Sequence, residues 1–365
     1  MITQVEKRSR ITISWSRLPP YAARLISAGL KKLDEPIEIV ASRPVALIDE
    51  VESIIDQPIH WVESNQNLSW SDLGLDIPQI FFQSGWLSKA FRSLGQEVLA
   101  NGGQVICFSD NSWKNTPRQW LGALVYRLIH RRNFAAVWVP GASGNKLMRL
   151  YGMPQNRIYQ RMYGADSQVF YSDKSLAKRE KTFTFVGQLI KRKGVNILLE
   201  AFAEFQKDYP DWKLKILGQG ELQGLVENLP GVELEGFKTP TEVASILRQS
   251  RFLILPSHEE HWGLVVHEAA SCGCGLILSD AVGAALDLAS DRNGVIFPAK
   301  NKAKLYDSLI KAASYTPEQL ENIYSETIVR AANFSPQNWA QTFLQIINDL
   351  TDWKVTSTDQ VIELC

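Results

Sequence analysis

Hydrophobic and polar positions change along the chain in blocks that predict strands and helices in turn. Short apolar runs, typical of buried parallel strands, recur in both halves. We expect strands at 10–15, 37–42, 59–62, 80–82, 103–109, 135–141, 157–159, 183–187, 212–217, 232–236, 252–255, 275–280 and 294–297. Longer amphipathic segments lie between many of them, at 21–33, 87–101, 194–209 and 241–249. This order predicts an α/β fold with parallel sheets.

Two helices are predicted near the C-terminal end. Thr316, Pro317 and Gln319 fit an N-cap, a first helical position and a capping-box partner. A final amphipathic helix follows Pro336 and runs to about 353. The length of 365 residues favours two domains, and 45% hydrophobic with 21% charged residues describes a globular protein with a sizeable core.

Charge and cysteine content narrow the function classes only slightly. Lys+Arg 39 balances Asp+Glu 39, although residues 1–172 hold 19 against 14, a balance of +5, which leaves 20 against 25 in the remainder. A basic first half suits an anionic acceptor or a lipid phosphate surface, and equally a solvated surface with chance asymmetry. The four cysteines have no zinc-ligand spacing. With no apolar signal core or membrane-length run, we expect a cytoplasmic protein.

The stretch 252–270 carries the most chemical information. It combines an apolar strand, a polar loop and an expected helix at about 263–272. Glu260 lies at the loop tip, and Glu268 lies eight positions later on the helix. A loop that leads from a strand into a helix forms an anion site at the helix N-terminus. Carboxylates in front of and behind such a site suit a hydroxyl-rich group attached to a phosphate, as in a sugar nucleotide.

This stretch closely resembles the glutamate-x7-glutamate motif of retaining glycosyltransferases with the GT-B fold, family 4 in particular. The matching residues are Pro256, Ser257, Glu260, Trp262, Gly263, Leu264, Glu268 and Ala269. The resemblance implies that Glu260 contacts hydroxyls of the donor sugar and Glu268 contacts the ribose. It also implies that backbone N–H groups of Trp262, Gly263, Leu264 and Val265 hold the diphosphate. The alternative is an ordinary amphipathic helix with two exposed glutamates.

A second segment, 186–194, resembles the family sequence Val-Gly-Arg-Leu-x-x-x-Lys-Gly. Gly187 and Lys193 match, and Gln188 stands where the family has arginine. By this resemblance Lys193 clamps the donor diphosphate and stabilises the leaving group, whereas Gln188 donates hydrogen bonds without charge. In one interpretation, Lys191 or Arg192 supplies the positive charge that the family arginine would carry at position 188. In the other, both side chains face solvent.

Glycines and one aromatic residue complete the expected donor site. Gly218 and Gly220 resemble the family's Gly-x-Gly after a strand, where glycine lets backbone approach a ligand; a tight turn is the alternative. Phe237 lies where the family places the base pocket.

The first half departs from the family pattern. It lacks the Gly-Gly loop after the first strand and the histidine after a later strand. Asp110 falls where a polar active-site residue is expected, and a turn or N-cap role is its alternative. Arg17, Tyr21 and Arg24 are further candidates. In the second half, His258 and His261 flank Glu260 and are candidate sugar contacts. The alternative is that they lie behind the residues that contact the sugar or are exposed to solvent. His267 is expected to be structural.

Residues 115–132 have apolar residues at helical spacing among several arginines. A basic amphipathic helix lies on a membrane or binds an anionic acceptor, although such an apolar stripe more often packs into a core. Nucleic-acid binding has no motif in its support.

The expected protein is therefore a family-4-like glycosyltransferase with a GT-B fold: two Rossmann-like domains with parallel sheets facing across a cleft, and a C-terminal helix crossing back to the first domain. The expected domains are 1–172, with the helix at about 336–365, and 173–335. The expected reaction transfers a hexosyl group from a UDP- or GDP-linked sugar to a glycan or lipid-linked hydroxyl, with retention, without metal or other cofactor. The catalytic candidates are Glu260, Lys193 and Asp110. The alternatives are a degenerate noncatalytic subunit and a sugar-nucleotide epimerase or hydrolase.

Overall fold

The computed structural model describes residues 10–33, 35–44, 48–226 and 229–350. By its internal contacts the chain divides into two compact units. The first comprises 1–140, 144–164 and 336–365, and the second comprises 141–143 and 165–335. The segment 171–180, around the expected domain boundary after residue 172, lies within the second unit. Its Arg179 is buried and donates hydrogen bonds to backbone carbonyls that include those of Lys174 and Cys272.

The first unit is built on a seven-stranded sheet in the order β3-β2-β1-β4-β5-β6-β7, with all pairs parallel. The strands are β1 (Ile11–Trp15), β2 (Ile37–Ala41), β3 (His60–Trp61), β4 (Ile80–Ser84), β5 (Gln104–Phe108), β6 (Ala136–Trp138) and β7 (Ile158–Tyr159). The strand order reverses direction between β1 and β4. Ligands of such open sheets bind at this switch point, outside the carboxyl ends of the strands.

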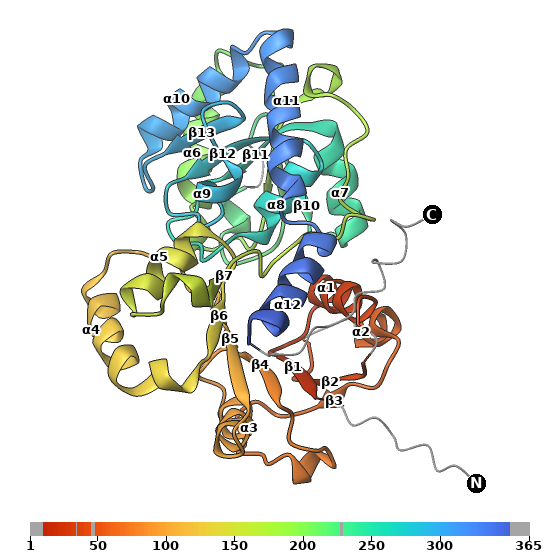
Figure 1. Ribbon diagram of the computed structural model, residues 1–365. Helices are drawn as coiled ribbons and strands as arrows, with labels where there is room; N and C mark the ends of the chain where they lie inside the picture. The colour runs from red at the N-terminus through yellow and green to blue at the C-terminus, as the bar shows by residue number, and fades with distance from the viewer. Residues whose placement is uncertain (1–9, 34, 45–47, 227–228, 351–365) are drawn as a thin grey trace. The chain divides into compact units, whose positions relative to one another are not determined.

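Two hydrophobic cores cover the faces of this sheet. One contains residues from α1 (Pro20–Leu30), α2 (Ile48–Ile55) and α12 (Pro336–Leu350), and the other contains residues from α3 (Lys89–Ala100), α4 (Pro117–Val125) and α5 (Ala142–Leu150). Helix α12 packs along α1 although it follows the whole second unit in sequence (Figure 1). The expected crossing of the C-terminal helix back to the first domain is therefore confirmed.

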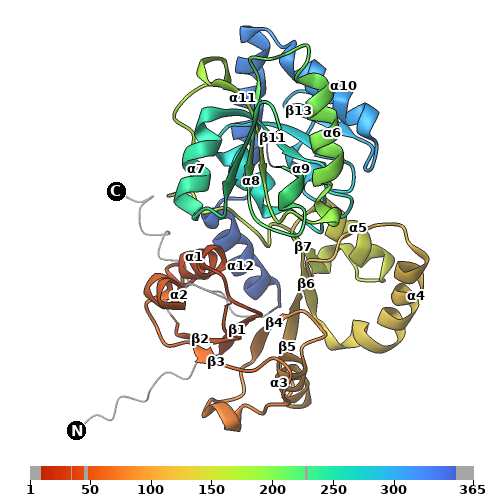
Figure 2. The same cartoon turned by 180° about the vertical axis from the view of Figure 1, so that it is seen from behind.

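The second unit is built on a six-stranded parallel sheet in the order β10-β9-β8-β11-β12-β13. Its strands are β8 (Glu180–Val186), β9 (Lys213–Leu217), β10 (Val232–Gly236), β11 (Ser250–Leu255), β12 (Gly275–Ser279) and β13 (Gly294–Phe297). Its helices are α6 (Val195–Phe205), α7 (Pro240–Gln249), α8 (Leu264–Ser271), α9 (Ala285–Leu288), α10 (Lys302–Ala313) and α11 (Pro317–Ala332). Helices α6 and α10 pack together on one face, and α8 and α11 pack together on the other (Figure 2). The switch point lies between β8 and β11.

Most predicted elements are present, and the capping box of Thr316 and Gln319 is confirmed. The helices α2, α5, α9 and α10 were not predicted individually. The end of the final helix, expected near residue 353, lies outside the described residues. Among the helices of the described ranges, none combines the length and apolar character needed to cross a membrane.

Candidate active site

Four loops at the carboxyl ends of β8, β9, β11 and β12 meet in the second unit. The loop after β8 is joined to the loop after β9 because Leu189 N–H donates to the Gln219 carbonyl at 2.9 Å. It is joined to the loop after β11 because His258 N–H donates to the Arg192 carbonyl at 2.8 Å. Glu260 N–H in turn donates to the Ala281 carbonyl at 3.2 Å. The motifs predicted to bind the donor therefore lie together at the switch point of this sheet.

Glycine at two positions in these loops has a packing reason. A Cβ at Gly218 would lie 1.9 Å from the Gly187 carbonyl oxygen. At Gly194, where φ is 71°, a Cβ would lie 2.1 Å from the Pro256 carbonyl oxygen. Neither backbone contact tolerates a side chain, so glycine is needed for the close approach of the loops. Gly220 is similarly close to the Leu189 carbonyl.

Lys193 and Glu260 form an ion pair in the middle of this loop cluster. Their side chains are only 13% and 12% exposed, so both groups are held in a partly dehydrated environment. Arg192 Nη1 lies 3.8 Å from the same Glu260 carboxylate oxygen and donates to the Glu259 carbonyl at 2.8 Å. Gln188 is exposed. A second positive charge beside the Lys193–Glu260 pair therefore comes from Arg192, one of the two residues that we considered for this role.

Buried polar atoms without a hydrogen-bond partner are concentrated in the loop 257–262. Among the described residues they include Ser257 Oγ, His258 Nε2, His261 Nδ1 and Trp262 Nε1. Buried polar groups are normally paired, and four orphans within six residues mark a site that fits a polar ligand. Burial lowers the pKa of His258, with a further contribution from the charge of Lys300. This shift favours the neutral form of His258, whose ring carries one donor and one acceptor.

Helix α8 begins directly behind this loop. Gly263 stands at its N-cap with φ 88° and offers no capping side chain. The first N–H groups of a helix have no acceptor within the helix, so those at Leu264 and Val265 are suited to an anion. Trp262 is 3% exposed and packs against Phe334 at 5.2 Å between ring centroids. Phe237, the candidate at the base pocket, follows β10 and is 75% exposed.

Helix α8 carries two titratable side chains with different environments. His267 is buried between the Ala165 N–H, at 2.8 Å from Nδ1, and the Ala331 carbonyl, at 2.9 Å from Nε2. Both ring nitrogens thus have backbone partners, which fits the expected structural role of His267, and burial lowers its pKa to about 4. Glu268 is half-buried, and burial alone raises its pKa to about 7.

The raised pKa of Glu268 predicts a specific pH dependence of stability. Because the folded state prefers protonated Glu268, protonation of this side chain contributes to the free energy of unfolding. The contribution is fully present below the unfolded pKa of 4.5 and is lost as pH rises through about 7. Glu268→Gln should therefore be more stable than the native chain at pH 8, by at most about 3 kcal/mol. Because Glu268 is partly exposed, contact of its carboxyl with water lowers this difference. Urea unfolding of both chains at pH 4.5 and pH 8 measures the difference. A difference that does not change with pH would contradict the prediction.

The first unit has its own pocket at the carboxyl ends of β1, β4 and β5. A cavity of about 470 Å³ is lined by residues that include Arg17, Tyr21, Ser109 and Asp110. Arg17 has φ 50°, and its N–H donates to Ser42 Oγ at 2.7 Å. A non-glycine residue in this left-handed region is uncommon, and such residues cluster at functional sites. Three of the candidates from the first half are thus brought together; Arg24, on α1, does not line this pocket.

Two residues of this pocket were missed by sequence reasoning. Tyr163 Oη donates to Asp110 Oδ2 at 3.5 Å, and its ring packs edge-on against Tyr21 at 5.9 Å. Ser109 Oγ is buried without a partner among the described residues. The sequence signal for Ser109 was its position at the end of the predicted strand 103–109. No local signal distinguishes Tyr163.

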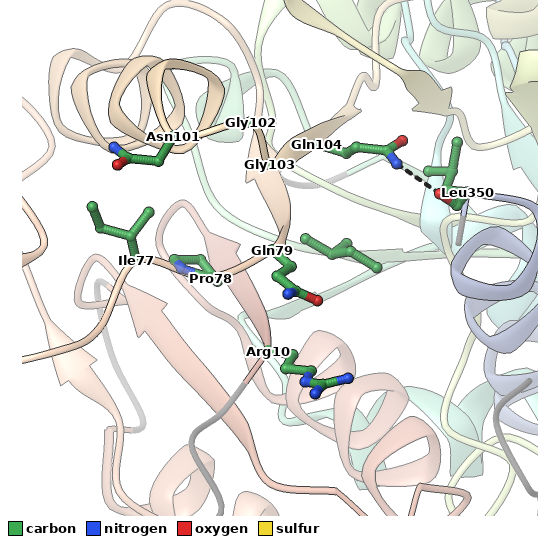
Figure 3. Close-up of a pocket in the computed structure, with 10 residues that line it drawn as sticks. Arg10, Ile77, Pro78, Gln79, Asn101, Gly102, Gly103, Gln104 and Leu350 are labelled. Carbon is green, nitrogen blue, oxygen red and sulfur yellow. Dashed lines mark hydrogen bonds between the residues drawn. The ribbon is translucent and has the colours of Figure 1, made fainter. Parts of the chain in front are cut away.

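A larger cavity of the first unit lies at the opposite end of the sheet. It has a volume of about 760 Å³ and is lined by Arg10, Gln104, Leu350 and the turns that precede β4 and β5 (Figure 3). Gln104 Nε2 donates to the Leu350 carbonyl at 2.6 Å across one side of it. Because the amino ends of parallel strands are not where α/β sheets bind ligands, volume alone gives this cavity no role.

The fold is that of GT-B glycosyltransferases. The chain resembles Anabaena HepE in complex with UDP and glucose, with a TM-score of 0.72, 15% identity and coverage of 94% of this chain and 100% of HepE. It also resembles sucrose-phosphate synthase from Thermosynechococcus elongatus, with a TM-score of 0.70, 15% identity and coverage of 94% and 99%.

Sequence comparison assigns the second unit more specifically. Residues 168–328 match the model of the family described as glycosyl transferases group 1, so this region is a domain of that type. An uncharacterized glycosyltransferase of Methanocaldococcus jannaschii is 31% identical over 133 residues, 35% of this chain and 36% of that protein. D-inositol 3-phosphate glycosyltransferase of Rhodococcus opacus is 26% identical over 223 residues, 55% of this chain and 50% of that protein. The chain thus spans half or less of the length of these relatives.

Proposed function

We propose that the chain is a glycosyltransferase that transfers a hexosyl group from a UDP- or GDP-linked sugar to a hydroxyl of a glycan or lipid-linked acceptor. The observation that carries the proposal is the partly dehydrated Lys193–Glu260 pair beside the orphaned polar atoms of the loop 257–262. The glycosyl transferases group 1 domain supports it, as does the fold shared with HepE, whose structure contains UDP and glucose.

In the proposed reaction the configuration of the sugar is retained and no metal or other cofactor takes part. The bond between the anomeric carbon and the diphosphate oxygen breaks, and its electron pair goes to the diphosphate. The acceptor oxygen bonds to the same face of the carbon, and its proton goes to the departing diphosphate. Lys193 and the N–H groups at the start of α8 stabilise the growing charge. Glu260 binds sugar hydroxyls, Glu268 binds the ribose, and Gly187 and Gln188 contact the diphosphate.

The first unit is proposed to supply the acceptor side. Its pocket offers Asp110, Tyr163 and Arg17 as hydrogen-bonding and charged groups. We place Asp110 near the reacting hydroxyl as an orienting group, since the leaving diphosphate takes the proton. We also propose that the protein works in the cytoplasm, with peripheral contact to a membrane. The buried free thiols of Cys107, Cys272 and Cys274 support only the first part, because they fit a reducing compartment.

A nucleotide panel tests the donor half of the proposal. Thermal unfolding is followed with UDP, GDP and ADP. A nucleotide at about 100 times its dissociation constant stabilises by about 2.7 kcal/mol, which raises Tm by roughly 5–10 °C. One nucleotide should produce the shift, Glu268→Ala should lose it, and Glu321→Ala, an exposed glutamate of α11, should keep it. No shift with any nucleotide would favour a degenerate, noncatalytic subunit, with Gln188 as the leading cause.

A further inference from the structure

Helix α4 and the π-helical turn after it (Tyr126–His130) present an apolar surface to solvent. Six large side chains of this surface are 41–73% exposed: Trp120, Leu121, Leu124, Val125, Leu128 and Ile129. The opposite side of the same segment packs into the core through Ala123 and Tyr126. The apolar stripe that usually packs into a core is therefore turned outward, and a contiguous exposed stripe of this kind marks an interaction surface.

The chain around this surface has an extreme charge distribution. Residues 111–165 contain no Asp or Glu. They contain nine cationic residues: Lys114, Arg118, Arg127, Arg131, Arg132, Lys146, Arg149, Arg157 and Arg161. Four of these cations are exposed and lie within the segment Pro117–His130 or directly after it: Arg118, Arg127, Arg131 and Arg132. The exposed apolar side chains are therefore accompanied by cationic side chains within the same segment and directly after it.

We propose that this surface docks on an anionic lipid bilayer. The apolar side chains enter the boundary between headgroups and acyl chains, and the arginines contact lipid phosphates. The segment Pro117–His130 spans about 20 Å as a helix, which is too short to cross a hydrocarbon core of about 30 Å and suits a helix in the plane of the interface. Trp120 has an exposed ring, and its indole N–H donates to Asn115 Oδ1 at 3.3 Å. Tryptophan, which is apolar over most of its ring and polar at the N–H, is enriched at membrane interfaces.

Charge decides against a second copy of the chain as the occupant. In a symmetric dimer the same patch meets itself, which would bring two acid-free cationic regions together. Like charges facing each other across an interface cost several kcal/mol, whereas an anionic lipid surface is complementary to both features. Helix α4 also lies at the periphery of the first unit, where a flat surface meets it without obstruction from that unit (Figures 1 and 2).

Vesicle co-sedimentation tests the proposal with the full chain. The native protein should bind vesicles of phosphatidylcholine mixed with phosphatidylglycerol, bind phosphatidylcholine alone far more weakly, and dissociate as salt is raised. Leu124→Ser/Leu128→Ser should weaken binding at least about tenfold. Arg131→Gln/Arg132→Gln should weaken binding to the anionic vesicles by about fivefold per charge. Val329→Ser, 66% exposed on α11, is the matched control and should bind as the native chain does.

Three results would overturn the proposal: no binding of the native chain to anionic vesicles, equal binding to both vesicle types, or unchanged binding by the leucine variant. A dimer in solution that the leucine variant dissociates, without vesicle binding, would assign the surface to self-association instead. Docking on a bilayer would bring the protein to a lipid-linked acceptor, but the evidence for it is the exposed apolar and cationic surface and not the enzymatic proposal. The nucleotide-induced thermal shift, measured without vesicles, tests the enzymatic proposal separately and should be the same in every variant.

Discussion

Lys193→Ala should lower kcat/KM for donor turnover by about 10²–10³, the usual cost of removing one group that stabilises a developing anion. Lys193 is paired with Glu260 and is only 13% exposed, so in the proposed reaction water screens its charge little from the leaving diphosphate. Its loss also removes the nearest cation from the Glu260 carboxylate, whose remaining ion-pair partner among the described residues is Arg192 at 3.8 Å. Both effects reduce stabilisation of the transition state.

Lys191→Ala is the matched control, because Lys191 belongs to the same short 3₁₀ turn and its side chain is exposed. Initial rates with the donor identified by the nucleotide panel measure both variants. Lys191→Ala should stay close to the native rate. If Lys193→Ala also retained activity within about threefold, its assignment to the leaving group would be wrong. Combining Lys193→Ala with Glu260→Gln should cost less than the sum of the single changes, because paired groups are not additive.

The parallel sheets and the position of the donor motifs were predictable from local sequence. Short apolar runs identified the strands because both faces of a parallel sheet are buried. The motif residues after β8, β9 and β11 then had to meet, since carboxyl ends of parallel strands share one edge of a sheet. Their packing was not predictable, and Gly218 shows why: its need for glycine comes from the Gly187 carbonyl, thirty-one positions earlier in the chain.

The helices that escaped prediction differ in cause. Helix α5 contains Ser143, Gly144 and Asn145 near its start, residues with weak helix propensity, so only its tertiary packing defines it. Helix α10 had a readable signal, because Asn301 caps it and Leu305 and Leu309 recur at helical spacing. The orientation of α4 could not be read from periodicity, which predicts a stripe but not whether protein or another surface covers it.

Trp339→Ala should destabilise the first unit by about 3–5 kcal/mol, the range for truncating a large buried aromatic side chain. Trp339 is fully buried, stacks on Trp138 at 4.7 Å between ring centroids, and lies 5.4 Å from Phe343. Its indole N–H donates to the Met162 carbonyl at 3.0 Å. Truncation therefore opens a cavity between α12 and the sheet and leaves a buried carbonyl without this donor.

Urea unfolding of the native chain and the variant measures this loss. The transition of the first unit should move to lower urea, while the nucleotide-induced shift of the second unit is kept, because Trp339 packs entirely within the first unit. Gln341→Ala on the exposed side of α12 controls for changes in the helix itself and should shift stability by less than about 0.5 kcal/mol. A loss below about 1 kcal/mol in Trp339→Ala would mean that α12 contributes little to the first unit. Helix α12 would then not be an essential part of the core of the first unit.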